Sequence, residues 1–180
     1  MTRAHVSAAS GDLTELFRDE AGTLLGFFIR RGVAAHDAAD LVSETFLAAW
    51  KSSGRHRIEP EMLRAWLFGI ARKVLSQHRR GHIRRSALAD RLRATLSFDN
   101  SARADGSLDG PDPALAQHVR ELIQYLLETD QEIVRLVYWE GFSQEEVATI
   151  LGKPATTVRA RLSRARAILR EQLAESGDGE

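Results

Sequence analysis

The sequence contains no cysteine, only four prolines and no long apolar run. Without cysteine, the chain can form no disulfide and can offer no thiolate ligand to zinc, haem or an iron–sulfur cluster. Its longest strongly apolar stretch, residues 24–29, is far shorter than the ~20 residues that span a bilayer. Residues 1–10 lack the apolar segment of a secretory signal peptide. We therefore expect a cytoplasmic protein, and a length of 180 residues predicts one or two domains.

The sequence also lacks net charge, because 25 basic residues balance 25 acidic ones. The charges are nevertheless segregated along the chain. Residues 51–93 carry twelve Lys or Arg residues against three acids, and residues 153–170 carry six without any acid. Residues 9–50 and 94–132 are acidic, at −4 and −6. Because local patches set the field at a surface, the two basic segments are candidate contacts for a polyanion.

Helical periodicity is lost after residue 93. Residues 94–112 are rich in Gly, Ser and Asp and contain one proline, and a second proline follows at Pro113. This composition predicts a flexible acidic linker. On either side, apolar residues recur at intervals of three and four without strand-like alternation. The pattern predicts an all-α protein with two small helical domains, at residues 10–93 and 113–174.

Cap and turn residues suggest where the helices begin and end. Asp12 with Glu15 resembles a helix start, Gly32 a stop, and Pro60 suits the first position of a helix. Residues 84–96 either extend that third helix or form a short fourth one. The expected helices are 12–31, 37–50, one from residue 60 with an apolar stripe at 63, 67, 70 and 74, and then 113–127, 130–139, 144–151 and 155–173.

The sharpest local signal is a helix, a short turn and a second helix near the end of the chain. Ser143 and Glu146 form a capping box, and Gly152 suits a left-handed helix end. This spacing is typical of a DNA-binding helix-turn-helix, whose second helix enters the major groove. A solvated basic face on a bundle helix is the alternative. Six bases without an acid leave no salt-bridge partners along the helix, which favours nucleic acid.

A helical projection of residues 155–170 separates three kinds of position. Apolar side chains face the core, small ones lie opposite, and arginines line both flanks, an arrangement suited to close entry into a groove. The core positions are Val158, Leu162, Ala165 and Leu169; the outer ones are Thr156, Ala160, Ser163 and Ala167; the flanks carry Arg159, Arg166 and Arg170 on one side and Arg161 and Arg164 on the other.

Two helices of the first domain carry surfaces of opposite charge. In residues 37–50, acids alternate with leucines expected to be exposed, a pattern that suits protein docking but equally fits an ordinary acidic helix exterior. The expected core face there is Val42, Phe46, Ala49 and Trp50. In residues 64–80, bases lie beside Trp66 and Phe68, which could stack on an unpaired nucleotide or belong to the core. Ala65, Gly69 and Ser76 are expected between these bases on the outer face.

Three segments carry a family resemblance: DAADLVSETFLAAW at 37–50, RAWLFGIARKVLSQHRR at 64–80, and VYWEGFSQEEVATILGKPATTVRARLSRARAILREQL at 137–173. Together they resemble the extracytoplasmic-function (ECF) subfamily of bacterial RNA polymerase sigma factors. The resemblance covers nearly all of the chain except the linker and the tails. It implies that the first domain is sigma region 2, the second is sigma region 4, and the linker threads the RNA-exit path of the polymerase.

The resemblance also implies partners and site residues. The partners are core RNA polymerase through its β′ and β subunits, duplex promoter DNA and the melted non-template strand, with an anti-sigma factor as a candidate. It implies no cofactor, metal, catalytic residue or membrane contact. The implied core-binding residues are Asp37, Asp40, Leu41, Glu44, Thr45 and Leu47. The implied −10 contacts are Arg55, Arg57, Trp66, Arg72, Lys73, Ser76, Arg79 and Arg80. The implied −35 contacts are Lys153, Thr156, Thr157, Arg159, Ala160, Arg161, Ser163, Arg164 and Arg166.

The sequence departs from the family pattern at three places. Lys73 stands where family members usually have Asn, Thr156 where many have Gly, and Glu128-Thr129 where a Leu-Pro is usual. We therefore draw no −10 base preference from the resemblance. A stand-alone, dimeric helix-turn-helix regulator is the rival function, although it leaves the first domain without a role. An enzyme is disfavoured because the six histidines are scattered and no metalloprotease, nucleophile-elbow or P-loop motif occurs.

Overall fold

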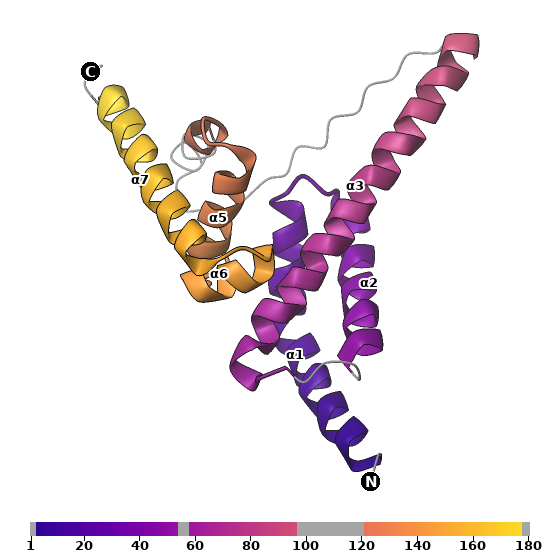
Figure 1. Ribbon diagram of the computed structural model, residues 1–180. Helices are drawn as coiled ribbons and strands as arrows, with labels where there is room; N and C mark the ends of the chain where they lie inside the picture. Colours follow the sequence, from indigo (N-terminus) through magenta and orange to yellow (C-terminus); the bar gives the residue numbers. More distant parts are fainter. Residues whose placement is uncertain (1–2, 54–57, 97–120, 178–180) are drawn as a thin grey trace. The chain divides into compact units, whose positions relative to one another are not determined.

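The computed structural model describes the backbone of residues 3–53, 58–96 and 121–177, and side chains within 14–53, 58–84 and 121–173. Every regular element in these ranges is a helix, as the apolar spacing predicts. The chain forms two compact units, Met1–Gly106 and Ser107–Glu180 (Figure 1). No helix in the described ranges is long and apolar enough to span a bilayer.

The first unit contains α1 (Arg3–Ile29), α2 (Ala35–Ser53), a 3-10 turn η1 (Pro60–Met62) and α3 (Leu63–Leu96). Both α1 and α3 pack against α2. The rings of Phe27 and Phe68 meet edge to face at 5.4 Å and join α1 to α3. Pro60 occupies the start of η1, as its fixed backbone favours. Residues 84–96 continue α3, which settles the alternative left open by the sequence.

The expected start of the first helix at Asp12 is wrong. The helix α1 begins at Arg3, so Asp12 lies inside it and cannot be its cap. Ala4, Ala8 and Ala9 precede Asp12, and extending an existing helix through such residues is easier than starting a new one. The helix ends at Ile29, and Gly32 follows with a φ of 80° that favours glycine, as expected.

The second unit contains α5 (Glu128–Tyr138), α6 (Gln144–Leu151) and α7 (Ala155–Gly177), with α7 packed against both others. A short helical segment at residues 121–124 precedes them. The expected helix 113–127 lies partly outside the described residues. Its described part ends at residue 124, three residues earlier than expected. The amides of Tyr125 and Leu126 donate to carbonyls three residues back, so the chain turns there and α5 begins at Glu128, before the expected residue 130.

Candidate nucleic-acid interface

The helix-turn-helix is fixed by local hydrogen bonds that the sequence predicted. The backbone amide of Ser143 donates to Glu146 Oε2 at 2.8 Å, and Ser143 Oγ accepts from the amide of Glu146 at 3.2 Å. These bonds form the predicted capping box of α6. Gly152 ends α6 at φ 61° and ψ 39°, a left-handed conformation that glycine adopts without strain. The start of α7 is therefore held in a defined position after α6.

The helix α7 presents the faces that the projection predicted. Val158, Leu162 and Ala165 are fully or almost fully buried, whereas Leu169 is half-buried. Opposite them lie exposed side chains that are small or cationic, namely Thr156, Ala160, Ser163, Arg164 and Ala167. Lys153 and Thr157 are half-buried at the turn. The exposed face is narrow enough for close approach to a nucleic-acid groove.

Some arginines of α7 bind a residue outside α7 and others do not, a division that the sequence did not predict. Although the helix offers no acid to Arg161, α5 does, and Arg161 Nη1 donates to Asp130 Oδ1 at 2.9 Å. The side chain of Asp130 is 3 % exposed, so this ion pair is largely buried. Arg161 therefore joins α7 to α5, and its assignment as a free DNA contact needs revision.

Two further arginines of α7 have neighbours on other helices. Arg166 Nε donates to the hydroxyl of Tyr138 at 2.7 Å, and Arg159 lies 3.4 Å from Glu145 with both side chains exposed. An exposed pair of this kind contributes little stability and separates readily. Arg164 has no hydrogen bond or ion pair with any described residue, and its guanidinium is exposed. Of Arg159, Arg161, Arg164 and Arg166, Arg164 is therefore the best placed to contact DNA directly.

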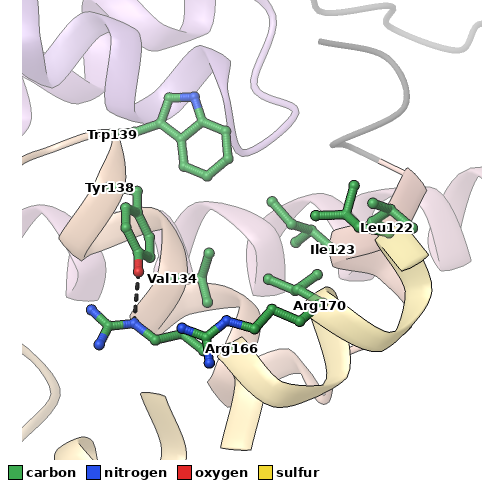
Figure 2. Close-up of a pocket in the computed structure, with 9 residues that line it drawn as sticks. Leu122, Ile123, Val134, Tyr138, Trp139, Arg166 and Arg170 are labelled. Atoms are coloured by element: carbon green, nitrogen blue, oxygen red, sulfur yellow. Dashed lines mark hydrogen bonds between the residues drawn. The ribbon is translucent and has the colours of Figure 1, made fainter. Parts of the chain in front are cut away.

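A groove of about 460 Å³ lies beside α7 in the same unit (Figure 2). Its wall is mainly apolar, and Arg166 and Arg170 supply cations at its edge. Figure 2 shows the hydrogen bond from Arg166 to Tyr138 within this lining. The apolar and aromatic lining residues are Leu122, Ile123, Val134, Tyr138, Trp139, Leu169 and Leu173.

The sequence analysis did not find this groove. Its walls come from three separate segments, residues 122–123, α5 and α7, and no single periodic stripe unites them. The adjacent aromatics Tyr138 and Trp139 were the available signal, since both remain partly exposed at the end of α5. Exposed aromatic residues clustered with arginine are typical of protein interfaces.

On α2, the acidic residues are accessible but two of the proposed core-binding residues are not. Asp40 and Glu44 are exposed, Asp37 is half-buried beside His36, and Leu47 is exposed. Leu41 and Thr45 are buried, and Thr45 Oγ1 donates to the carbonyl of Leu41 at 2.7 Å. The expectation that Leu41 is exposed is wrong. Because α2 packs against both α1 and α3, it buries a wider arc than one amphipathic face.

Aromatic side chains of the first unit also differ from expectation. Trp50 was expected in the core but is 53 % exposed. Phe46 is half-buried and stacks edge to face on the partly exposed Phe17, with ring centroids 4.4 Å apart. Leu47 and Trp50 are thus apolar residues exposed on the helix that carries Asp40 and Glu44. Acidic and apolar groups on one surface are suited to protein docking.

The helix α3 combines exposed bases with a half-buried tryptophan. Arg72, Lys73, Arg79 and Arg80 are exposed, and Trp66 and Ser76 are half-buried. Arg79 Nη2 donates to the carbonyl of Arg31 at 2.8 Å, and Arg80 Nη1 donates to Ser76 Oγ at 2.9 Å. Phe68 and Ala65 are fully buried, so the expectation that Ala65 lies on the outer face is wrong. Arg55 and Arg57 lie outside the described residues.

Comparison with known protein families identifies both units. The family described as Sigma-70 region 2 matches residues 16–85, and the family described as Sigma-70, region 4 matches residues 116–169. The chain is 30 % identical over 175 residues to the ECF RNA polymerase sigma factor SigL of Mycobacterium tuberculosis, covering 95 % of this chain and 94 % of that protein. It is 29 % identical over 148 residues to the RNA polymerase sigma-H factor of Pseudomonas aeruginosa, covering 79 % and 76 %.

Solved structures share the fold. The sigma factor RpoE of Bartonella quintana, solved with the anti-sigma factor NepR, has a TM-score of 0.64 and is 27 % identical, with 91 % of this chain and 97 % of that chain covered. CnrH, solved with the cytosolic domain of CnrY, has a TM-score of 0.61 at 23 % identity, with 96 % and 97 % covered.

Proposed function

Because the chain belongs to the sigma-70 family, as an ECF RNA polymerase sigma factor, we propose that its two units recognise the two elements of a promoter for core RNA polymerase. An ECF sigma factor directs promoter-specific transcription initiation. Its contribution is recognition, and the polymerase catalyses RNA synthesis. We assign no catalytic residue to this chain and place its activity in the cytoplasm, together with the polymerase.

The expected domain at residues 113–174, which lies within the second unit, is proposed to read the −35 element. The observation that carries this assignment is the exposed outer face of α7, on which small side chains flank the guanidinium of Arg164, which has no partner among the described residues. Ala160 and Ser163 permit close approach to base edges, and Arg164 can reach a guanine or a phosphate. Thr156, Thr157 and Arg159 lie near the start of α7, and Lys153 lies in the turn before it. On this proposal, that end of α7 enters the groove first. Arg166 uses only Nε for Tyr138, so on this proposal its other guanidinium nitrogens can reach DNA while that bond is kept.

Replacing Arg164 by Ala tests the −35 assignment. We expect holoenzyme affinity for a cognate promoter to fall about 10- to 100-fold, because a specific arginine contact contributes ~1–3 kcal/mol. The free energy of unfolding should not change, since the side chain has no bond to another described residue. Fluorescence anisotropy with labelled promoter DNA measures the affinity.

Arg18→Ala is the matched control, because Arg18 is an exposed arginine on α1 of the other unit. It removes the same charge and should leave promoter affinity near the wild-type value. Equal affinities of the Arg164→Ala and wild-type holoenzymes would exclude Arg164 from the interface.

The expected domain at residues 10–93, which lies within the first unit, is proposed to engage the −10 element and the core enzyme through different helices. On α3, the half-buried Trp66 offers an aromatic surface to a base extruded from the duplex, and the neighbouring cations Arg72, Lys73 and Arg80 would hold the backbone. On α2, Asp40, Glu44 and Leu47 would contact the β′ subunit. Leu41 and Thr45 are assigned an indirect role, because both are buried and shape α2 from inside.

The apolar groove of the second unit is proposed to bind the β subunit of core polymerase. Its lining suits an amphipathic segment that inserts apolar side chains and offers acidic groups to Arg166 and Arg170. Leu173 is partly exposed at this groove. We expect Leu173→Asp to reduce −35-dependent transcription at least tenfold, because the change removes an apolar contact of the groove and adds a carboxylate that would compete with the partner's acids for Arg170. Run-off transcription on promoters with and without a −35 element measures this.

Gln124→Asp is the control for the groove, because it adds the same charge at an exposed position that does not line the groove. It should retain −35-dependent transcription. If Leu173→Asp behaves like this control, the groove is not the docking site.

The rival function, a stand-alone helix-turn-helix regulator, predicts tight binding to duplex DNA by the isolated chain as a dimer. Gel-shift measurements with and without core polymerase distinguish the two functions. Sequence-specific binding only in the presence of core polymerase is expected here. An anti-sigma factor is a candidate restraining partner, by analogy with the RpoE complex.

A further inference from the structure

Arg166 lies where two surfaces of the second unit meet. It is exposed on α7 and follows Ser163 by three residues, so the two side chains share one side of the helix. It also lines the apolar groove, together with Tyr138 and Arg170 (Figure 2). Two kinds of partner are therefore within its reach, a phosphate of DNA and an acidic group bound in the groove.

The guanidinium of Arg166 is held by a single side chain. Its Nε donates to the hydroxyl oxygen of Tyr138 at 2.7 Å, and its Cζ lies 5.7 Å from the centroid of the tyrosine ring (Figure 2). No other described residue forms a hydrogen bond or ion pair with Arg166. Two contacts with one ring restrict a side chain that is otherwise long and flexible. Tyr138 therefore sets the orientation of this guanidinium.

The backbone that carries Tyr138 is itself fixed. Tyr138 is the last residue of α5, and Gly141 then turns the chain with a φ of 72°. The amide of the buried Phe142 donates to the carbonyl of Leu136 at 3.0 Å, which ties this turn back to α5. A tyrosine side chain adds only two rotatable bonds to such a backbone. The hydroxyl of Tyr138 therefore occupies a defined position beside α7.

Tyr138 differs from the partner of Arg161 because it is neutral. Arg161 is bound by the carboxylate of Asp130, so its charge meets an opposite charge. Tyr138 orients Arg166 without an opposite charge, and it occupies only one of the five N–H donors of the guanidinium. The positive charge and the four N–H groups on Nη1 and Nη2 remain for another partner.

We propose that Tyr138 is a positioning residue for promoter binding, and that it holds Arg166 toward a backbone phosphate at the margin of the −35 element. This inference rests on the proposed function. Arg166 lies 11 residues after Ala155, the first residue of α7, or about 16 Å along the helix axis, whereas a major groove is about 12 Å wide. The start of α7 would meet base edges. Arg166 would lie beyond them, where the sugar–phosphate backbone passes.

An acidic group in the groove is the alternative partner of Arg166. Arg170 lies one turn further along α7, is exposed, and lines the same groove. It forms no hydrogen bond or ion pair with a described residue. The groove therefore has a cation of its own, and Arg166 is not needed to bind an acid there.

Holding Arg166 in advance should strengthen binding to the −35 element. An arginine that becomes ordered only on binding loses rotamer freedom at that moment, and this loss weakens affinity by about 2- to 10-fold for one side chain. A neutral partner avoids the loss without cancelling the charge that a phosphate attracts. Tyr138 thus contributes to DNA affinity although it belongs to α5, outside the helix that enters the groove.

The test compares Tyr138→Phe, Arg166→Ala and the double variant as holoenzymes on a promoter with a −35 element. Tyr138→Phe keeps the ring and removes only the hydroxyl, so affinity by fluorescence anisotropy should fall about 2- to 10-fold. In the Arg166→Ala background the same change should have no effect, because the side chain that Tyr138 positions is absent. Tyr125→Phe is the matched control, because Tyr125 is 70 % exposed and does not line the groove.

Salt dependence identifies the group that Arg166 binds. Loss of one phosphate contact lowers the slope of log affinity against log salt by about 0.9. Between about 50 and 200 mM salt, wild-type affinity should therefore fall about 3.5-fold more than that of Arg166→Ala. Tyr138→Phe keeps the charge of Arg166 and should retain the wild-type slope.

Equal affinities of the Tyr138→Phe and wild-type holoenzymes would overturn the proposal. An equal loss in the Arg166→Ala background would do the same, because Tyr138 would then act independently of Arg166. An unchanged salt slope in Arg166→Ala would exclude the phosphate. If Tyr138→Phe weakens binding to core polymerase without DNA and leaves promoter affinity unchanged, Arg166 serves the groove partner, which equally refutes the proposal.

A structural role for Tyr138 gives a separate readout. Both side chains of the pair are exposed, so amide hydrogen exchange of α5 and α7 in Tyr138→Phe should stay near the wild-type value. Faster exchange that accounts for the loss of affinity would make the hydroxyl a fold contact and would overturn the positioning role.

Failure of the proposed function gives a different result. If the wild-type chain with core polymerase does not initiate from a cognate promoter, the sigma-factor assignments fail as a whole. If it initiates and Arg164→Ala weakens promoter binding as expected, whereas Tyr138→Phe does not, the positioning role of Tyr138 alone is refuted.

Discussion

Reversing the charge of Asp40 and Glu44 together should abolish binding of the chain to core RNA polymerase. Both carboxylates are exposed on α2. A polymerase surface that binds them would be positively charged, so an Asp40→Arg, Glu44→Arg variant would place positive charge against positive charge. Opposed like charges at an interface cost several kcal/mol, which corresponds to a loss of at least about 100-fold in affinity. Co-elution with purified core enzyme on a sizing column, followed by a fluorescence titration, measures the change.

The matched control reverses Glu15 and Asp19, two exposed acids on α1 with the same four-residue separation. Glu15→Arg with Asp19→Arg changes the net charge equally and should retain core binding. Neither double variant should lose much thermal stability, because none of the four side chains is buried. Retained co-elution of the α2 variant would remove the β′ docking assignment, and loss in both variants would indicate a general charge effect.

Replacing Arg161 by Ala should unfold the helix-turn-helix unit at a markedly lower temperature. The substitution leaves the carboxylate of Asp130 almost fully enclosed without its partner. Breaking such a pair from one side costs about 3 kcal/mol or more, which corresponds to a decrease of at least about 10 °C in Tm for a small domain. Amide hydrogen exchange of α5 and α7 in the full chain measures the loss, because it reports on this unit separately.

A double variant distinguishes the structural role of Arg161 from a contact with DNA. Asp130→Leu with Arg161→Met replaces both charges by apolar groups and should recover most of the stability. Recovery should be incomplete, since Asp130 also lies in the first turn of α5, where an acid is favourable. Wild-type −35 affinity in this variant would make Arg161 purely structural. A stable variant that binds promoter weakly would return Arg161 to the DNA interface.

Arg161 and Arg164 show how far the sequence could identify the site. They lie three residues apart on one flank of the projected helix, and nothing local separates them. The structure separates them because Asp130, distant in sequence, approaches only one of the two. A helical projection assigns faces but contains no information on neighbouring helices. The absence of acids from residues 153–170 therefore indicated more free arginines than the structure contains.

Other corrections share this cause. Leu41 and Thr45 are buried because α2 has a neighbour on each side, and Trp50 is exposed because that packing turns the helix away from the expected orientation. The groove beside α7 also needs three segments at once. By contrast, the capping box of Ser143 and the left-handed Gly152 depend only on nearby residues, and both were predicted from the sequence.

The sequence by itself determined the all-α class, the two helical units, the helix-turn-helix and the segregation of charge. These features follow from periodicity and local hydrogen bonding, which act over a few residues. Tertiary structure alone decided which arginines have protein partners, which residues of α2 a partner can reach, and that α7 borders an apolar groove. Those properties depend on contacts between helices far apart in the chain, and burial exists only once the helices have packed.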